Sequence, residues 1–89
     1  MPRVSFTQNL QRHVRRDPLE VAGSTLKEAL EAVFAVTPQM RGYVLEDQGS
    51  IRRHVVVFID GEQSQDRDGL SDPLRPDSDV HVMQALSGG

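Results

Sequence analysis

Few residues of this chain are of a type that carries out covalent chemistry. It has no cysteine, which excludes thiolate zinc sites, iron–sulfur clusters and a cysteine nucleophile. Its three histidines, His13, His54 and His81, lack the spacing of a metal site. We interpret the last two as polar residues on the outer face of a sheet. The sequence contains neither a glycine-rich phosphate loop nor a nucleophile elbow. It therefore predicts a protein that is not an enzyme and that binds no metal and no cofactor.

The last five residues, 85–89, are the exception, because they end in Leu86, Ser87, Gly88 and Gly89. Glycine has no Cβ, so this tail can pass a narrow channel and take backbone angles closed to other residues. Fully extended, it reaches about 17 Å, enough to carry the α-carboxylate of Gly89 into the active site of another protein. Attack of that carboxylate on ATP would give an acyl-adenylate, and sulfur could then replace the adenylate to leave a thiocarboxylate. Gly89 is the candidate reactive residue.

Length and composition predict the kind of domain to which this tail is attached. The chain has 89 residues, of which 37% are hydrophobic, enough for one modest core. We therefore expect a single domain over residues 1–84 and a flexible tail over residues 85–89. The net charge of −3 argues against nucleic acid as the main partner. The longest apolar run has five residues, far short of a membrane span, and no signal peptide is recognisable. A cytoplasmic protein without membrane contact is expected.

One amphipathic helix is predicted after Thr25. Thr25 and Glu28 form a capping box, in which the threonine hydroxyl accepts from the Glu28 amide and the glutamate reaches back. An apolar stripe at helical spacing follows: Leu26, Ala29, Leu30, Val33 and Phe34. Pro38 disfavours helical geometry at the residue before it, so the helix should end near Val36.

The strands are predicted from alternation and from β-branched residues. Residues 3–9 and 19–22 alternate and should form a hairpin, whereas residues 55–59 are apolar throughout and predict a central strand. Residues 80–83 form the last strand. We expect a small hairpin around residues 46–51, a polar loop over 63–68, and a turn over 69–74 whose two leucines enter the core.

This order of elements predicts the fold class. Two hairpin strands, a helix and further strands are most simply arranged as an α+β protein of the β-grasp (ubiquitin-like) type, a mixed sheet with one main helix packed on one face. The crossover rule makes the first and last strands parallel neighbours in the middle of the sheet.

The chain resembles the MoaD/ThiS family of ubiquitin-like sulfur carrier proteins over nearly its whole length. The resemblance lies in the capped helix from Thr25, in residues 55–61, in residues 69–74, in residues 77–80 and in Gly88-Gly89. It departs from the family at Gln84-Ala85, where a proline is frequent. The resemblance implies a β-grasp fold, activation of Gly89 by an adenylating enzyme of the ubiquitin-activating type that consumes ATP, a sulfur donor protein, and an acceptor synthase that takes sulfur from the thiocarboxylate.

Three functions remain open from the sequence. The first is a sulfur carrier, which includes the small non-catalytic subunit of a molybdopterin synthase. The second is a ubiquitin-like modifier that is conjugated to lysines through the same glycine. The third is a plain β-grasp interaction module.

The partner-binding surface is predicted from the alternation of the last two long strands. We place Val55, Val57 and Ile59 under the helix, which leaves Val56 and Phe58 on the open face of the sheet. Met83 should point the same way, and Leu86 lies just beyond it on the tail. These four residues (Val56, Phe58, Met83 and Leu86) are the expected docking site of the activating enzyme, because exposed apolar patches usually mark interaction sites.

Overall fold

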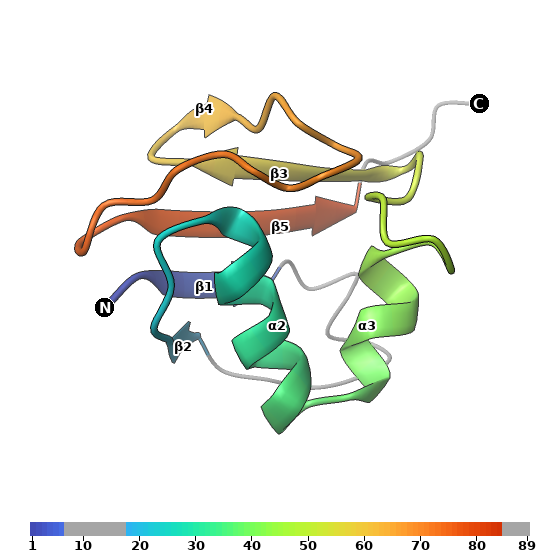
Figure 1. Cartoon of the computed structure of the whole chain (residues 1–89), viewed down its shortest axis with the longest axis horizontal. Coiled ribbons are helices and arrows are strands. Elements are labelled where there is room, and N and C mark those ends of the chain that lie inside the picture. The colour runs from blue at the N-terminus through green and yellow to red at the C-terminus, as the bar shows by residue number, and fades with distance from the viewer. Residues whose placement is uncertain (7–17, 85–89) are drawn as a thin grey trace.

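The computed structural model describes residues 1–6 and 18–84. Two helices and five strands occur in these two ranges (Figure 1): β1 Arg3–Phe6, β2 Leu19–Glu20, α2 Leu26–Val36, α3 Gln39–Val44, β3 Val55–Ile59, β4 Glu62–Gln63 and β5 Asp79–Gln84. The expected first strand, residues 3–9, is described only as far as Phe6. The second strand is shorter than predicted. None of the helices in the described ranges is long and apolar enough to cross a membrane.

The five strands form one mixed sheet in the order β2-β1-β5-β3-β4. Strands β1 and β5 pair in parallel, and the other three pairings are antiparallel. The parallel pairing of the first and last strands is the one that the crossover rule predicts, and it places β5 at the centre. Residues 55–59 form β3, which lies between β5 and the two-residue edge strand β4 and is therefore an interior strand, as predicted.

Helix α2 lies across one face of this sheet (Figure 1). It begins where predicted, with the Thr25 hydroxyl accepting a hydrogen bond from the Glu28 amide at 3.3 Å. The Glu28 carboxylate, however, reaches back to the amide and hydroxyl of Ser24, at 2.8 and 3.0 Å, one residue further than in a capping box. These hydrogen bonds hold the pKa of Glu28 below its ordinary value. All five residues of the predicted stripe are buried.

Two elements were not predicted. Helix α3 follows Pro38 in a segment whose apolar residues are sparse, and its Met40 and Val44 are fully buried. Strand β4 overlaps the expected polar loop at Gln63, and it was missed because Glu62 and Gln63 show no alternation of apolar residues. Its pairing follows from the turn between β3 and β4, where Asp60 and Gly61 have φ values of +52° and +86°.

The remaining turns match the sequence. Leu45 and Ile51 form an isolated antiparallel bridge across the expected hairpin. Leu70 and Leu74 are 3% and 8% exposed, so both leucines of the 69–74 turn enter the core. This turn is held by Asp66, whose carboxylate accepts hydrogen bonds from Gly69 and from the amide and hydroxyl of Ser71. The same bonds lower the pKa of Asp66.

The core lies between the sheet and the two helices. On the sheet side it is built from alternate strand residues, with Val4, Val55, Val57, Val80 and Val82 fully buried. Ile59 is partly buried and packs against this core. The prediction that Val55, Val57 and Ile59 face the helix is therefore confirmed. The opposite set of strand residues must point to the other face of the sheet.

Candidate functional site

The candidate site is the face of the sheet turned away from α2, which we call the outer face. On β3 the outward residues are Val56 and Phe58, and on β5 they are Asp79, His81 and Met83. The residues of β3 that alternate with them, Val55, Val57 and Ile59, pack in or against the core. The outer face therefore follows directly from the strand alternation.

Strand register brings the apolar outward residues together. Val56 pairs with Met83, and Phe58 pairs with His81, across the antiparallel ladder between β3 and β5. Directly opposed side chains in a sheet lie close enough to interact. Val56 and Phe58 are half-buried, and Met83 is 38% exposed, unusually high for a large apolar side chain on a central strand. We call Val56, Phe58 and Met83 the apolar patch.

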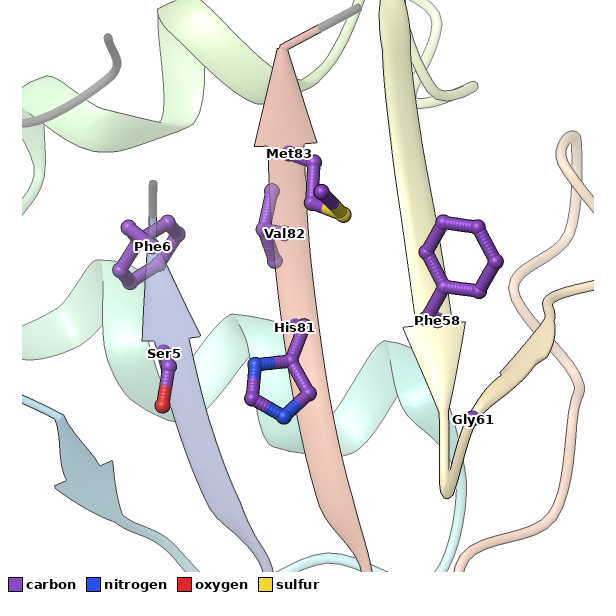
Figure 2. Close-up of a pocket in the computed structure, with 7 residues that line it drawn as sticks. All are labelled: Ser5, Phe6, Phe58, Gly61, His81, Val82 and Met83. Atoms are coloured by element: carbon purple, nitrogen blue, oxygen red, sulfur yellow. The ribbon is translucent and has the colours of Figure 1, made fainter. Parts of the chain in front are cut away.

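Next to this patch the outer face is hollowed. The hollow has a volume of about 350 Å³ and is lined by Ser5, Phe6, Phe58, Gly61, His81, Val82 and Met83. Figure 2 shows Phe58 and Met83 standing on neighbouring strands, with the His81 imidazole between Phe58 and the Ser5 side chain. From the sequence, Ser5 and His81 could be identified only as polar residues within strands of alternating polarity. The strand register is what places them beside the aromatic ring.

The charged residues of the outer face lie at its other end. Arg3 on β1 pairs with Asp79 on β5 and with Glu20 on β2, so all three point to the same side of the sheet. Along β5 the outer face therefore runs from Asp79 through His81 to Met83, from charged to apolar. Gln84, the last residue of β5, follows Met83 directly.

The tail residues Leu86, Ser87, Gly88 and Gly89 lie outside the described residues. Their attachment point is described: Gln84 pairs with Val55, next to the pair of Met83 and Val56. The chain thus leaves the sheet at the apolar end of the outer face. Of the predicted docking residues, Val56 and Met83 pair next to this exit, and Phe58 lies on the same face two residues further along β3, opposite His81. The fourth, Leu86, belongs to the undescribed segment.

The histidines do not form a metal site in the described parts of the chain. No group of three His, Cys, Asp or Glu side chains there could hold a metal ion. His81 and His54 are both exposed, but the register separates them: His81 is opposite Phe58, while His54 precedes Val55 at the far end of β3. His13 lies outside the described residues.

The turn between β3 and β4 borders the hollow through Gly61, and its Asp60 forms hydrogen bonds and an ion pair of its own. The Asp60 carboxylate accepts hydrogen bonds from the Asp79 amide and the Ser78 hydroxyl, both at 2.9 Å, and forms an ion pair with Arg75 at 3.3 Å. These interactions, the amide of Asp79 foremost, hold the pKa of Asp60 below its ordinary value. The carboxylate is thereby fixed to the start of β5, away from the hollow.

Comparison with solved structures gives close matches over the whole chain. A chain of the crystal structure of the Amycolatopsis orientalis BexX/CysO complex superposes with a TM-score of 0.85 and covers 100% of both chains at 19% identity. The chain has the ubiquitin-like β-grasp fold. The predicted fold class is confirmed by this match and by the strand order.

Two further structures have the same fold. Mycobacterium tuberculosis CysO gives a TM-score of 0.82 at 18% identity and covers 97% of this chain and 100% of its own. Haloferax volcanii SAMP1, a small archaeal modifier protein, gives 0.77 at 22% identity with coverage of 99% and 98%. All three matches are below 25% identity, and what they show is a shared fold. No protein-family model and no curated protein sequence matches the chain.

Proposed function

We propose that this protein is a sulfur carrier whose Gly89 carboxylate is adenylated by a partner enzyme and converted to a thiocarboxylate. The observation that carries the proposal is the combination of a fold shared with CysO and a Gly88-Gly89 segment that follows β5. The apolar patch extends along β3 and β5 to the end of the sheet from which that segment departs, where Val56 and Met83 pair. Docking at the patch would therefore bring the tail toward the active site of the same partner.

The proposed chemistry has two steps. A carboxylate oxygen of Gly89 attacks the α-phosphorus of ATP, pyrophosphate leaves, and an acyl-adenylate forms. A sulfide equivalent from a sulfur donor protein then attacks the acyl carbon, AMP leaves, and the thiocarboxylate remains. The thiocarboxylate is the nucleophile that an acceptor synthase uses. The ATP binds to the adenylating enzyme of the ubiquitin-activating type and not to this chain, and we place the reaction in the cytoplasm, where ATP is available.

The acceptor is a metabolite that gains sulfur, in the synthesis of a cofactor, of cysteine or of a related thiolated compound. One form of this function is the small non-catalytic subunit of a molybdopterin synthase. In every form the chain is a co-substrate, and the catalytic groups belong to its partners.

A second candidate function is conjugation to other proteins. The likeness to SAMP1, a modifier protein, favours it specifically. In that case a lysine amine and not sulfide would displace AMP or a thiol from the activated glycine, and an isopeptide bond would result. A plain β-grasp interaction module without tail chemistry is the third candidate.

Removal of Gly89 tests the proposal. We would purify the adenylating enzyme of the ubiquitin-activating type from the same organism and measure ATP–pyrophosphate exchange with the full chain, with a chain lacking Gly89, and with a chain extended by one residue. The proposal predicts exchange with the full chain only. Ser87→Ala is the control, since it alters the tail but keeps the glycine carboxylate. Full exchange by the truncated chain would overturn the carrier and the modifier alike.

Intact mass distinguishes the carrier from the modifier. After incubation with the adenylating enzyme, ATP and sulfide, a carrier gains the mass of one sulfur in place of one oxygen. Conjugates to lysine in a lysate, without any thiocarboxylate, would favour the modifier. If the full chain neither exchanges nor changes in mass, it is an interaction module.

A further inference from the structure

The hollow on the outer face has an unusual distribution of polar groups. Of its lining residues His81 alone can change charge near neutral pH, and Ser5 is the other polar side chain. The rest of the lining is apolar or glycine. Among the described residues the imidazole of His81 makes neither a side-chain hydrogen bond nor an ion pair, so it is available to a partner.

The charged groups that share the face lie away from the hollow. On β5 the nearest is Asp79, two residues before His81, and on β1 and β2 they are Arg3 and Glu20, which are paired in register with each other. The outward residues of β3, Val56 and Phe58, are uncharged, and Gln63 is the β4 residue paired with Phe58. Among residues 1–6 and 18–84, no carboxylate, lysine or arginine lines the hollow. A charged group of a partner would therefore lose its hydration there without gaining an opposite charge.

We propose that the hollow receives an apolar side chain of the adenylating enzyme, and that His81 must be uncharged for this docking to occur. The inference rests on the proposed function and adds the chemistry of the partner's contact. An apolar side chain seated between Phe58 and Met83 removes water from one side of the imidazole. Loss of water disfavours an imidazolium, whereas a neutral imidazole keeps one donor and one acceptor for the partner's backbone.

The sign of the pH effect follows from linkage. Docking prefers the deprotonated form, so binding is full at a pH where the imidazole is neutral and weakens as the pH falls and the imidazole takes up a proton. The dissociation constant should level off toward high pH. Toward low pH it should rise by up to about tenfold for each pH unit.

Binding between pH 5.5 and 8.5 tests this inference with three variants. His81→Gln is polar but cannot be charged, so it should bind nearly as well as the natural chain at pH 8 and should lose the pH dependence. His81→Arg, a permanent cation, should bind weakly at every pH. His54→Gln is the matched control, since His54 is exposed but outside the hollow, and it should keep the full pH dependence. Circular dichroism at each pH verifies that the variants remain folded.

The outcomes separate this inference from the proposed function. The inference is wrong if the affinity of the natural chain does not change with pH, or if His81→Gln keeps the pH dependence of the natural chain. In either case the carrier function stands. Binding of His81→Arg at the natural affinity would contradict the inference equally. If the natural chain does not bind the adenylating enzyme even at pH 8, the proposed function is overturned and the inference with it.

Discussion

The Asp60 carboxylate accepts a hydrogen bond from the Ser78 hydroxyl at 2.9 Å, which joins the turn after β3 to the residue before β5. Ser78 is only 1% exposed, and its hydroxyl also accepts a hydrogen bond from the Arg75 amide. Asp60 thus connects the turn after β3 to the segment that leads into β5, at one end of the sheet. Its left-handed backbone, with φ of +52°, is a conformation that Asp and Asn adopt more readily than other residues with side chains.

This connection predicts an acid-dependent loss of stability. The pKa of Asp60 is lowered in the folded protein, so its contribution to stability is present above the ordinary aspartate value of 3.8 and is lost as the pH falls through the lower, folded value. Asp66 has the same direction of shift. The free energy of unfolding should therefore decrease below about pH 4.

Asp60→Asn isolates the contribution of this charge. Asparagine keeps the shape of the side chain and tolerates the left-handed backbone. We expect the variant to be less stable than the natural chain at pH 7 and to depend less on pH between 3 and 5. Urea denaturation at a series of pH values measures both. An unchanged pH profile in the variant would show that Asp60 is not one of the groups that titrate with folding.

A second prediction concerns the core under the helix. Leu30 is fully buried in the middle of α2, and its replacement by alanine leaves a cavity among the neighbouring side chains. Leu30→Ala should lower the free energy of unfolding by about 2–5 kcal/mol. The neighbouring Glu31 is exposed, so Glu31→Ala should change it by no more than about 0.5 kcal/mol. Equal effects of the two substitutions would contradict the packing of α2.

How far the sequence predicts this molecule depends on the period of its apolar residues. Helix α2 and the inward and outward residues of β3 and β5 were predicted correctly. In each of these short segments the apolar residues repeat with one period, helical or alternating, and this period defines the face that is buried. Helix α3 was missed, since its burial rests on only Met40 and Val44 and a glycine interrupts it. Strand β4 was missed because a two-residue strand exists only through its pairing with β3.

For the candidate site, alternation predicted that Val56, Phe58 and Met83 share a face, but it could not predict the register. Which outward residues are neighbours depends on pairing across strands that lie more than twenty positions apart in sequence. His81 was therefore interpreted as a surface residue, and its place opposite Phe58 became evident only from the ladder between β3 and β5.

A third prediction compares two glycines. Gly61 has φ of +86°, a conformation that residues with a Cβ rarely adopt, although a Cβ there would meet no atom within 4 Å. Gly61→Ala should therefore destabilise the protein by about 1–2 kcal/mol through backbone strain alone. Gly42 lies in α3, and a Cβ there also meets nothing within 4 Å. Gly42→Ala should stabilise the protein by about 0.5–1 kcal/mol, because alanine has the higher helix propensity. Thermal unfolding of both variants measures the difference. Shifts of the same sign would show that one of these backbone conformations is wrong.

The last prediction concerns docking at the apolar patch. Phe58 is half-buried on the outer face and borders the hollow, so Phe58→Asp would place a charge on the proposed contact without entering the core. A charge buried without a partner is strongly unfavourable in an interface. Because central aromatic residues contribute most to such contacts, binding to the adenylating enzyme should weaken by roughly tenfold or more.

Val36→Asp is the matched control for that substitution. Val36 is 55% exposed at the end of α2, which lies on the other side of the sheet. An acidic residue at a helix C-terminus lowers stability slightly, by about 0.3–1 kcal/mol, but should leave the affinity unchanged. Circular dichroism and a titration with the enzyme decide between the two faces. If Phe58→Asp is folded and binds normally, or if Val36→Asp weakens binding as much, the enzyme does not dock on the outer face, and the path from the apolar patch to Gly89 is not the one that positions the tail.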